Sequence, residues 1–467
     1  MLVFLLVLVV VLALLGGVHW YVWKRLVRDV TAAGGTARRL GTAAAFVLPV
    51  LALAALTSGR AGAPFWLQQV VAWPGFLWLA LLLYVTLALV VGEAVRPLLR
   101  RWLERRDAGA TASGDGRDGT AAATEPTDSG HSGSRAGTPA GGPVATAGGG
   151  ASTPAGDLLT EVDAEPSPTG PEDGAETHRG TDEAGATGPA GATAVSRRLF
   201  VSRVVGGAAA AAAVGTVGYG TYGVLRGPRV KRVTVPLAKV PRAVHGYRIA
   251  VVSDIHLGPI LGRAHSQRIV DTINATQPDL IAIVGDLVDG TVENLGPAAE
   301  PLAQLRARHG SFFVTGNHEY FSGADAWVDH VRELGLRPLR NERVEIAAGF
   351  DLAGVDDIAG ESEGQGPDFA AALGDRDRAK AAVLLAHQPI VIHDAVRHGV
   401  DLQLSGHTHG GQLWPGNYLA DLANPTVAGL ERYGDTQLFV SRGAGAWGPP
   451  VRVGAPSDIT LVELASK

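Results

Sequence analysis

The chain has 467 residues and a formal net charge of −5, so it lacks the basic excess typical of nucleic-acid-binding proteins, and no nucleic-acid partner is expected. It contains no cysteine, which excludes disulfides, thiolate zinc sites and cysteine nucleophiles, so any metal must be held by His, Asp, Asn or Glu. The length has room for roughly two to four units, and the composition divides the chain into unlike regions.

Residues 1–106 are predicted to form a transmembrane region with three helices. The apolar runs are 2–22, 42–56 and 76–95, and the first and third are long enough to span a bilayer. A cleaved signal peptide is the alternative for the first run. That run lacks a basic start and an obvious small-x-small cleavage site, which favours a retained helix.

Basic residues flank these runs unevenly. Arg60 is the one basic residue between the second and third runs. By the positive-inside rule, the N-terminus is therefore outside and the segment after the third run is cytoplasmic. The other flanks carry Lys24, Arg25, Arg28, Arg38 and Arg39 after the first run and Arg96, Arg100, Arg101, Arg105 and Arg106 after the third.

Residues 107–195 are rich in Gly, Ala, Thr, Pro and Ser and contain 14 Asp and Glu against 3 Arg. A stretch with so few large apolar side chains cannot bury enough surface to offset the entropy of ordering it. A disordered acidic linker is therefore predicted, and an acidic interaction tail is the functional alternative.

Residues 196–226 are predicted to return the chain to the membrane. Arg197 and Arg198 precede a weakly apolar run at 204–224, which resembles a twin-arginine export signal. The alternative is a fourth transmembrane helix whose cytoplasmic flank carries the two arginines. Because the preceding linker is predicted to be cytoplasmic, both interpretations predict a multi-pass protein of the cell membrane with an extracytoplasmic C-terminal region.

Residues 227–467 contain short β-branched runs that alternate with amphipathic stretches, a pattern typical of a layered α/β domain with at least one mixed sheet. About 240 residues can form one domain with its own core. The predicted helices are 266–275, 298–307, 324–334 and 391–398. The predicted strands are 230–235, 247–253, 280–285, 311–315, 343–347, 382–386, 402–405, 437–441 and 459–464.

Five of these strands end in residues that can bind metal. Because ligands of an open α/β sheet bind at the carboxyl ends of its strands, the five ends are expected to converge. Asp and Asn are ordinary turn residues, so any one motif means little, but five such motifs by chance are far rarer. The residues are Asp254 and His256, Asp286, Asn317 and His318, His387, and His407 and His409.

The spacing of the last pair also carries a prediction. On a strand, His407 and His409 would point to the same face, and Gly410 and Gly411 would leave clearance for a substrate phosphate. Nine of the 14 histidines, such as His265, lie outside the five motifs and are interpreted as surface or structural residues.

The donor set predicts the chemistry. Two carboxylates, one amide and at least four imidazoles exceed the needs of one ion, so two divalent ions such as Mn, Fe, Zn or Ni are expected rather than calcium. Two ions about 4 Å apart clamp the attacking and leaving oxygens of an in-line displacement, and a metal-bound water that ionises near neutral pH supplies the nucleophile. One histidine should stay unligated to serve the leaving group.

These motifs, in this order over about residues 247–464, resemble the calcineurin-like metallophosphoesterase superfamily. The resemblance implies a four-layer sandwich of two mixed β-sheets flanked by helices. It implies that Asp286 bridges two ions and that His318 is the unligated catalytic residue. The remaining ligands would be Asp254, His256 and His409 for one ion and Asn317, His387 and His407 for the other.

Residues 409–412 and 441–445, with Arg452, resemble the membrane-associated bacterial branch of this superfamily and its twin-arginine-exported phosphoesterases. Protein serine/threonine phosphatases carry an Arg after the second Asp of the Gly-Asp motif, whereas Gly290 follows Asp289 here, which disfavours a protein substrate. The expected function is hydrolysis of a phosphodiester or phosphomonoester in a small-molecule or lipid substrate. The alternatives are a lipid-linked pyrophosphatase with a UDP-2,3-diacylglucosamine-type substrate and a non-catalytic metal-binding membrane scaffold.

Overall fold

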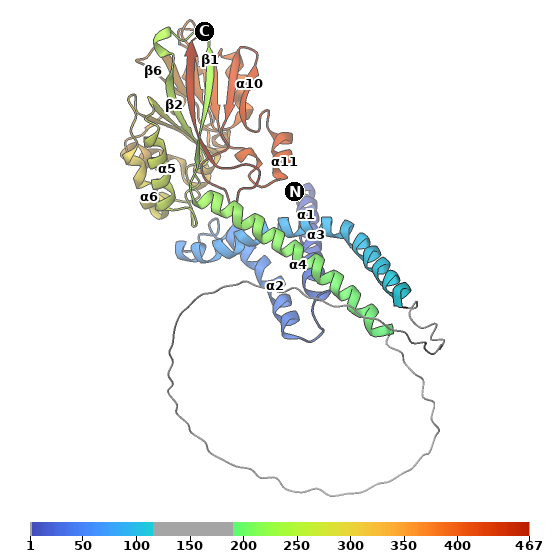
Figure 1. Ribbon diagram of the computed structural model, residues 1–467. Helices are drawn as coiled ribbons and strands as arrows, with labels where there is room; N and C mark the ends of the chain where they lie inside the picture. The colour runs from blue at the N-terminus through green and yellow to red at the C-terminus, as the bar shows by residue number, and fades with distance from the viewer. Residues whose placement is uncertain (1, 115–189, 467) are drawn as a thin grey trace, which may run out of the picture. The chain divides into compact units, whose positions relative to one another are not determined.

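Long helices make up the N-terminal part of the computed structural model, which describes residues 2–114 and 190–466 (Figure 1). They are α1 (Leu2–Trp23), α2 (Thr36–Thr57), α3 (Phe65–Gly114) and α4 (Ala190–Leu225), and a π-helical turn at Lys24–Arg28 continues α1. In the described ranges, four helical segments are long and apolar enough to cross a membrane: 9–28, 36–57, 65–106 and 197–225.

The helices extend beyond the apolar runs that predicted them. α3 continues to Gly114, into the predicted linker, because the Leu, Arg, Glu and Ala residues after the run favour helix. α4 likewise begins at Ala190, before the predicted boundary. The rest of the linker prediction, residues 115–189, lies outside the described residues. By its contacts the chain divides into two units, Met1–Leu103 with Ala194–Lys467, and Glu104–Thr193.

Two six-stranded mixed sheets form the C-terminal part. The first has the order β1-β12-β2-β3-β4-β5, in which β12 and β2 pair antiparallel and all other neighbours pair parallel. The second has the order β10-β11-β9-β8-β7-β6, with antiparallel pairs at its two edges and parallel pairs between them. The strands are β1 Arg229–Leu237, β2 Tyr247–Val252, β3 Leu280–Val284, β4 Ser311–Val314, β5 Arg337–Pro338, β6 Glu342–Ile346, β7 Phe350–Gly354, β8 Ala382–Leu385, β9 Leu402–Ser405, β10 Gly429–Tyr433, β11 Thr436–Val440 and β12 Asp458–Ser466.

Side chains alternate between two cores along the buried strands. In β3, Leu280 and Val284 lie in the core between the sheets, whereas Ile281 and Ile283 pack under helices on the outer face. Helices α5, α6 and α8 cover the first sheet, and α9 and α10 cover the second. The fold is therefore the predicted four-layer sandwich. The helix bounds are α5 Arg263–Ala275, α6 Val292–Ala299, α7 Asn317–Ser322, α8 Ala324–Glu333, α9 Phe369–Leu373, α10 Ile392–Arg397 and α11 Gly416–Ala423.

The sequence prediction missed some short elements and misplaced one. All nine predicted strands are present, but β5, β7 and β10 and helices α7, α9 and α11 were not predicted. The predicted helix at 298–307 is wrong, because α6 ends at Ala299 and a 3₁₀ turn follows over Glu300–Gln304. Pro301 lacks the N–H that would continue an α-helix there.

Candidate metal centre

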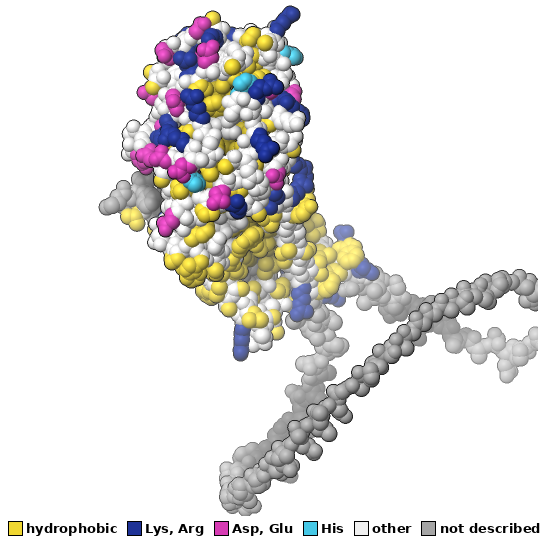
Figure 2. Space-filling model, turned by 90° about the vertical axis from the view of Figure 1, so that its left-hand side faces the viewer, with side chains coloured by type: hydrophobic (Ala, Val, Ile, Leu, Met, Phe, Trp, Pro, Cys, Tyr) yellow, Lys and Arg dark blue, Asp and Glu magenta, His cyan; other side chains and the backbone are white. Residues whose placement is uncertain are grey.

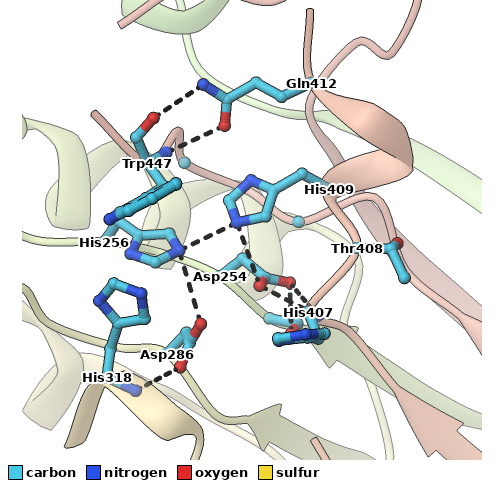
Figure 3. A network of polar contacts seen from close by, with 12 residues as sticks. Asp254, His256, Asp286, His318, His407, Thr408, His409, Gln412 and Trp447 are labelled. Carbon is cyan, nitrogen blue, oxygen red and sulfur yellow. Dashed lines mark hydrogen bonds and ion pairs between the residues drawn. The ribbon is translucent and has the colours of Figure 1, made fainter. Parts of the chain in front are cut away.

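The loops that follow β2, β3, β4, β8 and β9 hold the candidate site (Figure 3). Five predicted site residues in them have left-handed backbone, with φ of 53° at Asp254, 49° at His256, 54° at Asp286, 73° at His407 and 53° at His409. This region costs a non-glycine residue roughly 1–2 kcal/mol. Such strain persists where the surrounding contacts hold it, and it clusters at functional sites.

The histidine pair does not lie on a strand, so that part of the sequence prediction is wrong. β9 ends at Ser405, and His409 begins a 3₁₀ turn. The chain leaves the sheet at Gly406, where a Cβ atom would lie 1.7 Å from Ser253 Oγ of the neighbouring sheet. The turn separates the two rings, and each joins a different group of side chains.

Gly411 also differs from its prediction. A Cβ atom at Gly411 would lie 2.2 Å from the main-chain nitrogen of Asn417, in the first turn of α11. The residue has φ of 82°, which favours glycine. The start of α11 therefore fills the space beside Gly411, and that space is not open to a substrate phosphate.

Asp254, His256 and His409 form the first group that could hold a metal ion. Their ligand atoms lie within 4.8 Å of one another, and all three residues are buried. His409 Nε2 is 3.0 Å from His256 Nε2 and 3.4 Å from Asp254 Oδ1, and Figure 3 shows the two rings turned toward each other. The hydroxyl of Ser253 and the main-chain amide of His407 donate to the Asp254 carboxylate and hold it in place.

Asp286, His387 and His407 form the second group. His387 Nε2 lies 3.1 Å from Asp286 Oδ2, and the amide oxygen of Asn317 lies 3.0 Å from His407 Nδ1. The same Oδ2 of Asp286 is 3.7 Å from His256 Nε2, so one carboxylate oxygen faces imidazoles of both groups. The fold thus brings the predicted site residues together, while their assignment as ligands stays a prediction.

The donors of this site fit divalent cations. His387 Nδ1 lies 2.9 Å from the carbonyl oxygen of Val284, so the ring hydrogen belongs there and the Nε2 lone pair points at the Asp286 carboxylate. Two acceptors face each other in this way when a proton or a metal ion lies between them. His387 Nε2 is buried, and apart from this carboxylate oxygen it has no polar partner among the described residues. Imidazole nitrogens mixed with carboxylate and amide oxygens suit first-row divalent ions.

Protons compete with metal ions for these rings. Burial alone would lower the pKa of His256, but the carboxylates of Asp289, Asp286 and Asp254 outweigh it and raise the pKa to about 9. Burial alone would also lower the pKa of His387. The Asp286 carboxylate outweighs burial and raises this pKa well above its usual value. At neutral pH in the metal-free protein each ring therefore carries a second ring proton, and a binding metal ion must displace that second proton.

We expect the affinity for Mn²⁺ to fall as the pH falls from about 8 to about 6, by about tenfold per pH unit for each proton displaced. Isothermal titration calorimetry of the metal-free full chain in buffers of different ionisation enthalpy measures both the affinity and the protons released. An affinity that does not change with pH would contradict this expectation.

His318 lies on the open side of the site, where it is half-buried. Its Nδ1 is 2.7 Å from Asp289 Oδ1, and the same oxygen is 2.9 Å from His256 Nδ1. Burial raises the pKa of Asp289, but His256 and His318 outweigh it and hold the pKa at about 2, so the group stays a carboxylate. It orients both rings with Nε2 toward the site. Sequence reasoning missed this role, although Asp289 closes the Gly-Asp-Leu-Val-Asp run.

Glu319 fixes the position of Asp286 through the main chain. It is fully buried and accepts hydrogen bonds from the amides of Asp286, Leu287 and Gly316 at 3.0, 2.8 and 2.6 Å. Burial and the neighbouring Asp286 carboxylate raise the pKa of Glu319 to about 7. The amide of His318 donates to Asp286 Oδ1 at 2.9 Å. Glu319 therefore ties the loops after β3 and β4 together beneath the site.

Arg452 supports His409 from behind. It is buried, and its Nη1 donates to the carbonyl oxygens of His409 at 3.0 Å and Ala455 at 3.1 Å, while Nε donates to Gly445 O at 2.7 Å. Its Nη2 lies 3.0 Å from His409 Nδ1. Arg452 is far from the histidine in sequence, so its position behind the ring became visible only in the fold.

Arg452→Lys is expected to lower the affinity for Mn²⁺ about 10–100-fold, the usual effect of losing an outer contact that positions a metal ligand, because Arg452 holds the main chain of His409 through its carbonyl oxygen. A single ammonium group cannot reproduce the several fixed bonds of a guanidinium. Calorimetric titration measures the effect, and the matched control is Arg432→Lys, at an arginine whose side chain is 56% exposed. Equal affinities of the two variants would show that Arg452 does not position His409.

Comparisons with known proteins agree with this geometry. Residues 247–411 match the protein-family model described as calcineurin-like phosphoesterase. The chain is 39% identical over 259 residues to a Danio rerio protein named "Transmembrane protein with metallophosphoesterase domain", and the match covers 53% of this chain and 59% of the relative. The corresponding protein of Bos taurus is 40% identical over 253 residues, which cover 51% of this chain and 57% of the relative.

A bacterial relative is matched over almost its whole length. The chain is 36% identical over 243 residues to an uncharacterised metallophosphoesterase of Aquifex aeolicus (strain VF5), covering 51% of this chain and 92% of the relative. The two vertebrate proteins, by contrast, are matched over less than three fifths of their own lengths. With the strand-end motifs and the sandwich fold, these matches show that the chain belongs to the calcineurin-like metallophosphoesterase family.

Proposed function

We propose that this chain is a membrane-anchored phosphoesterase that uses two divalent metal ions to hydrolyse a phosphodiester or phosphomonoester. The observation that carries the proposal is the position of Asp286, whose Oδ2 faces His256 at 3.7 Å and His387 at 3.1 Å. A carboxylate shared in this way by two groups of metal-binding side chains is suited to bridge two ions. Family membership supports the same reaction.

The ligands proposed from the sequence fit this arrangement. Two ions, when bound, would polarise the phosphoryl oxygens and lower the pKa of a water at the site. Asp254 is held by two hydrogen bonds, and Asp286 is held by the amide of His318, so both carboxylates are positioned before metal binds. The proposed ligands are Asp254, His256, Asp286, Asn317, His387, His407 and His409, with Mn, Fe or Zn as candidate ions.

His318 is proposed to act on the leaving group. Asp289 accepts the Nδ1–H of the ring at 2.7 Å, which leaves Nε2 facing the open side. In its protonated form the ring would donate the Nε2–H to the leaving oxygen of the ester, the role of a general acid. His318 also lies within reach of His256 and Asp286 as a third metal-binding group, so the metal content of a variant without this ring distinguishes a ligand from a non-ligand.

The fourth apolar segment is proposed to be a retained anchor rather than a cleaved export signal. Val224, at the end of α4, is fully buried against Leu261 and Ala446 of the catalytic domain. The carbonyl of Gly220 in the same helix accepts from the main-chain nitrogen of Arg452 at 3.4 Å. Removing α4 would expose these contacts, so they favour the transmembrane-helix interpretation of residues 196–226.

The proposed orientation places the catalytic domain outside the membrane. The loop between α2 and α3, predicted to be extracytoplasmic, contacts the domain through Arg60, and Phe65 at the start of α3 makes a second contact. The Arg60 guanidinium lies 5.8 Å from the ring centroid of Phe321, and Phe65 packs against the core under α5 and α8. Both contacts are consistent with a loop and a domain on the same side of the membrane.

The test is an assay of the full chain in detergent or vesicles, loaded with Mn²⁺, on bis-nitrophenyl and nitrophenyl phosphates. We expect hydrolysis that disappears with a chelator and returns when Mn²⁺ is added back. If the folded, metal-loaded protein hydrolyses neither ester, the non-catalytic scaffold is the better interpretation. A lipid-linked pyrophosphatase is the second candidate, and the exposed apolar side chains beside the site favour it over a soluble nucleotide hydrolase.

A further inference from the structure

Exposed hydrophobic side chains border the open side of the metal centre. Two of them flank His318, whose ring centroid lies 5.5 Å from that of Phe321 and 5.8 Å from that of Trp447. Gln412 holds Trp447 in place by donating to its carbonyl at 2.9 Å and accepting from its amide at 3.0 Å (Figure 3). We call the set the apolar rim: Phe321, Trp414, Tyr418, Leu419, Leu422 and Trp447, each at least 50% exposed.

Helix α11 forms the outer part of the rim and has no buried residue of its own. Tyr418 and Leu422 are four positions apart and Leu419 and Leu422 three apart, so these side chains share one face of the helix. They are 62%, 72% and 84% exposed. The helix is nevertheless fixed to the metal centre, because its start packs against the backbone of Gly411.

The rim adjoins the membrane helices of the same chain. The hydroxyl of Tyr84 donates to the carbonyl of Trp414 at 3.0 Å, and Tyr84 lies within the apolar segment of α3. A Cβ atom at Gly448, next to Trp447, would lie 3.5 Å from the ring of Phe76 in the same helix. On the side of the molecule that carries α5 and α6, away from α11, Figure 2 shows hydrophobic side chains gathered over the lower part of the face in view, whereas charged side chains spread over the upper part.

An exposed apolar surface of this kind marks a binding site, and the helices that adjoin it are long and apolar enough to cross a membrane. We propose that α11 and Trp414 insert into the surface of the bilayer that holds the membrane helices, and that the rim admits phosphoester headgroups of lipids in that leaflet to the metal centre. The choice of a lipid substrate rests on the proposed phosphoesterase function, whereas the insertion of α11 does not.

The absence of cysteine permits a direct test of the insertion. Leu422→Cys in the full chain is labelled with an environment-sensitive fluorophore and reconstituted in phosphatidylcholine–phosphatidylglycerol vesicles. Asp435→Cys, at a fully exposed carboxylate of the β10–β11 turn, is the matched control. We expect a blue-shifted emission that acyl-chain-brominated lipids quench at position 422 but not at 435. Equal emission and equal quenching at the two positions overturn the inference. A blue shift at position 422 without quenching, as when a second protein chain covers α11, also overturns it.

A second experiment tests the substrate class. The double variant Leu419→Glu, Leu422→Glu places two charges on the exposed face without removing a buried contact. We expect its rate on soluble bis-nitrophenyl phosphate to stay within about twofold and its rate on phosphatidic acid in the same vesicles to fall about tenfold. Unchanged or equally reduced rates on both substrates overturn the inference.

The two experiments separate the inference from the proposed function. A wild-type chain that hydrolyses the soluble ester but not phosphatidic acid or phosphatidylglycerol overturns the lipid substrate and leaves the phosphoesterase intact. A wild-type chain that hydrolyses neither kind of substrate contradicts the phosphoesterase, while the fluorescence at position 422 still decides whether α11 inserts.

Discussion

Asp286→Asn is expected to remove most of the bound metal and to lower hydrolysis by on the order of 10³-fold or more, since a metal clamp contributes several kcal/mol to transition-state stabilisation. The carboxylate lies between His256 and His387, and an amide of the same shape carries no charge to hold two cations. Metal content by inductively coupled plasma mass spectrometry and the rate on bis-nitrophenyl phosphate measure the two effects.

Asp435→Asn is the control for this loss of a charge, because Asp435 is fully exposed and pairs with Arg432 at the surface. It should bind metal and hydrolyse the ester as the wild type does. If Asp286→Asn kept both metal ions and most of its activity, Asp286 would not bridge the ions, and the arrangement proposed for the site would be wrong.

His318→Ala is expected to keep the metal content near that of the wild type while slowing hydrolysis by about 10²–10⁴-fold, the range of general acid catalysis. The loss should grow as the leaving group becomes more basic, because a nitrophenolate leaves without a proton whereas an alkoxide does not. Rates on nitrophenyl, phenyl and alkyl phosphate esters measure this dependence, which a purely structural role of the ring would not produce.

The control for this variant is His393→Ala, at an exposed histidine of α10. His318 lies close to His256 and Asp286 and could itself bind metal, so metal content is the deciding measurement. If His318→Ala lost metal as Asp286→Asn is expected to, His318 would be a ligand and not the group that serves the leaving oxygen.

Much of the C-terminal domain was predictable because its signals are local. Buried strands such as β3 are continuous apolar runs. The residue that follows each run therefore lies at the carboxyl end of a strand, wherever that strand lies in its sheet. The short elements were harder. β7 carries the buried Asp351 and ends in Gly354, and neither residue is typical of a strand. The neighbouring β6 and β8 supply the hydrogen bonds that keep it extended.

The sequence by itself determined the residue types of the candidate metal centre, their order along the chain, and the apolar runs that form the long N-terminal helices. Tertiary structure decided which residues meet. It placed one oxygen of Asp289 against both His256 and His318, and it set Arg452 behind His409. It also left the apolar face of α11 exposed beside the site. The physical reason is that side-chain contacts between loops depend on how the sheets stack and where the chain turns, and no local pattern encodes those distances.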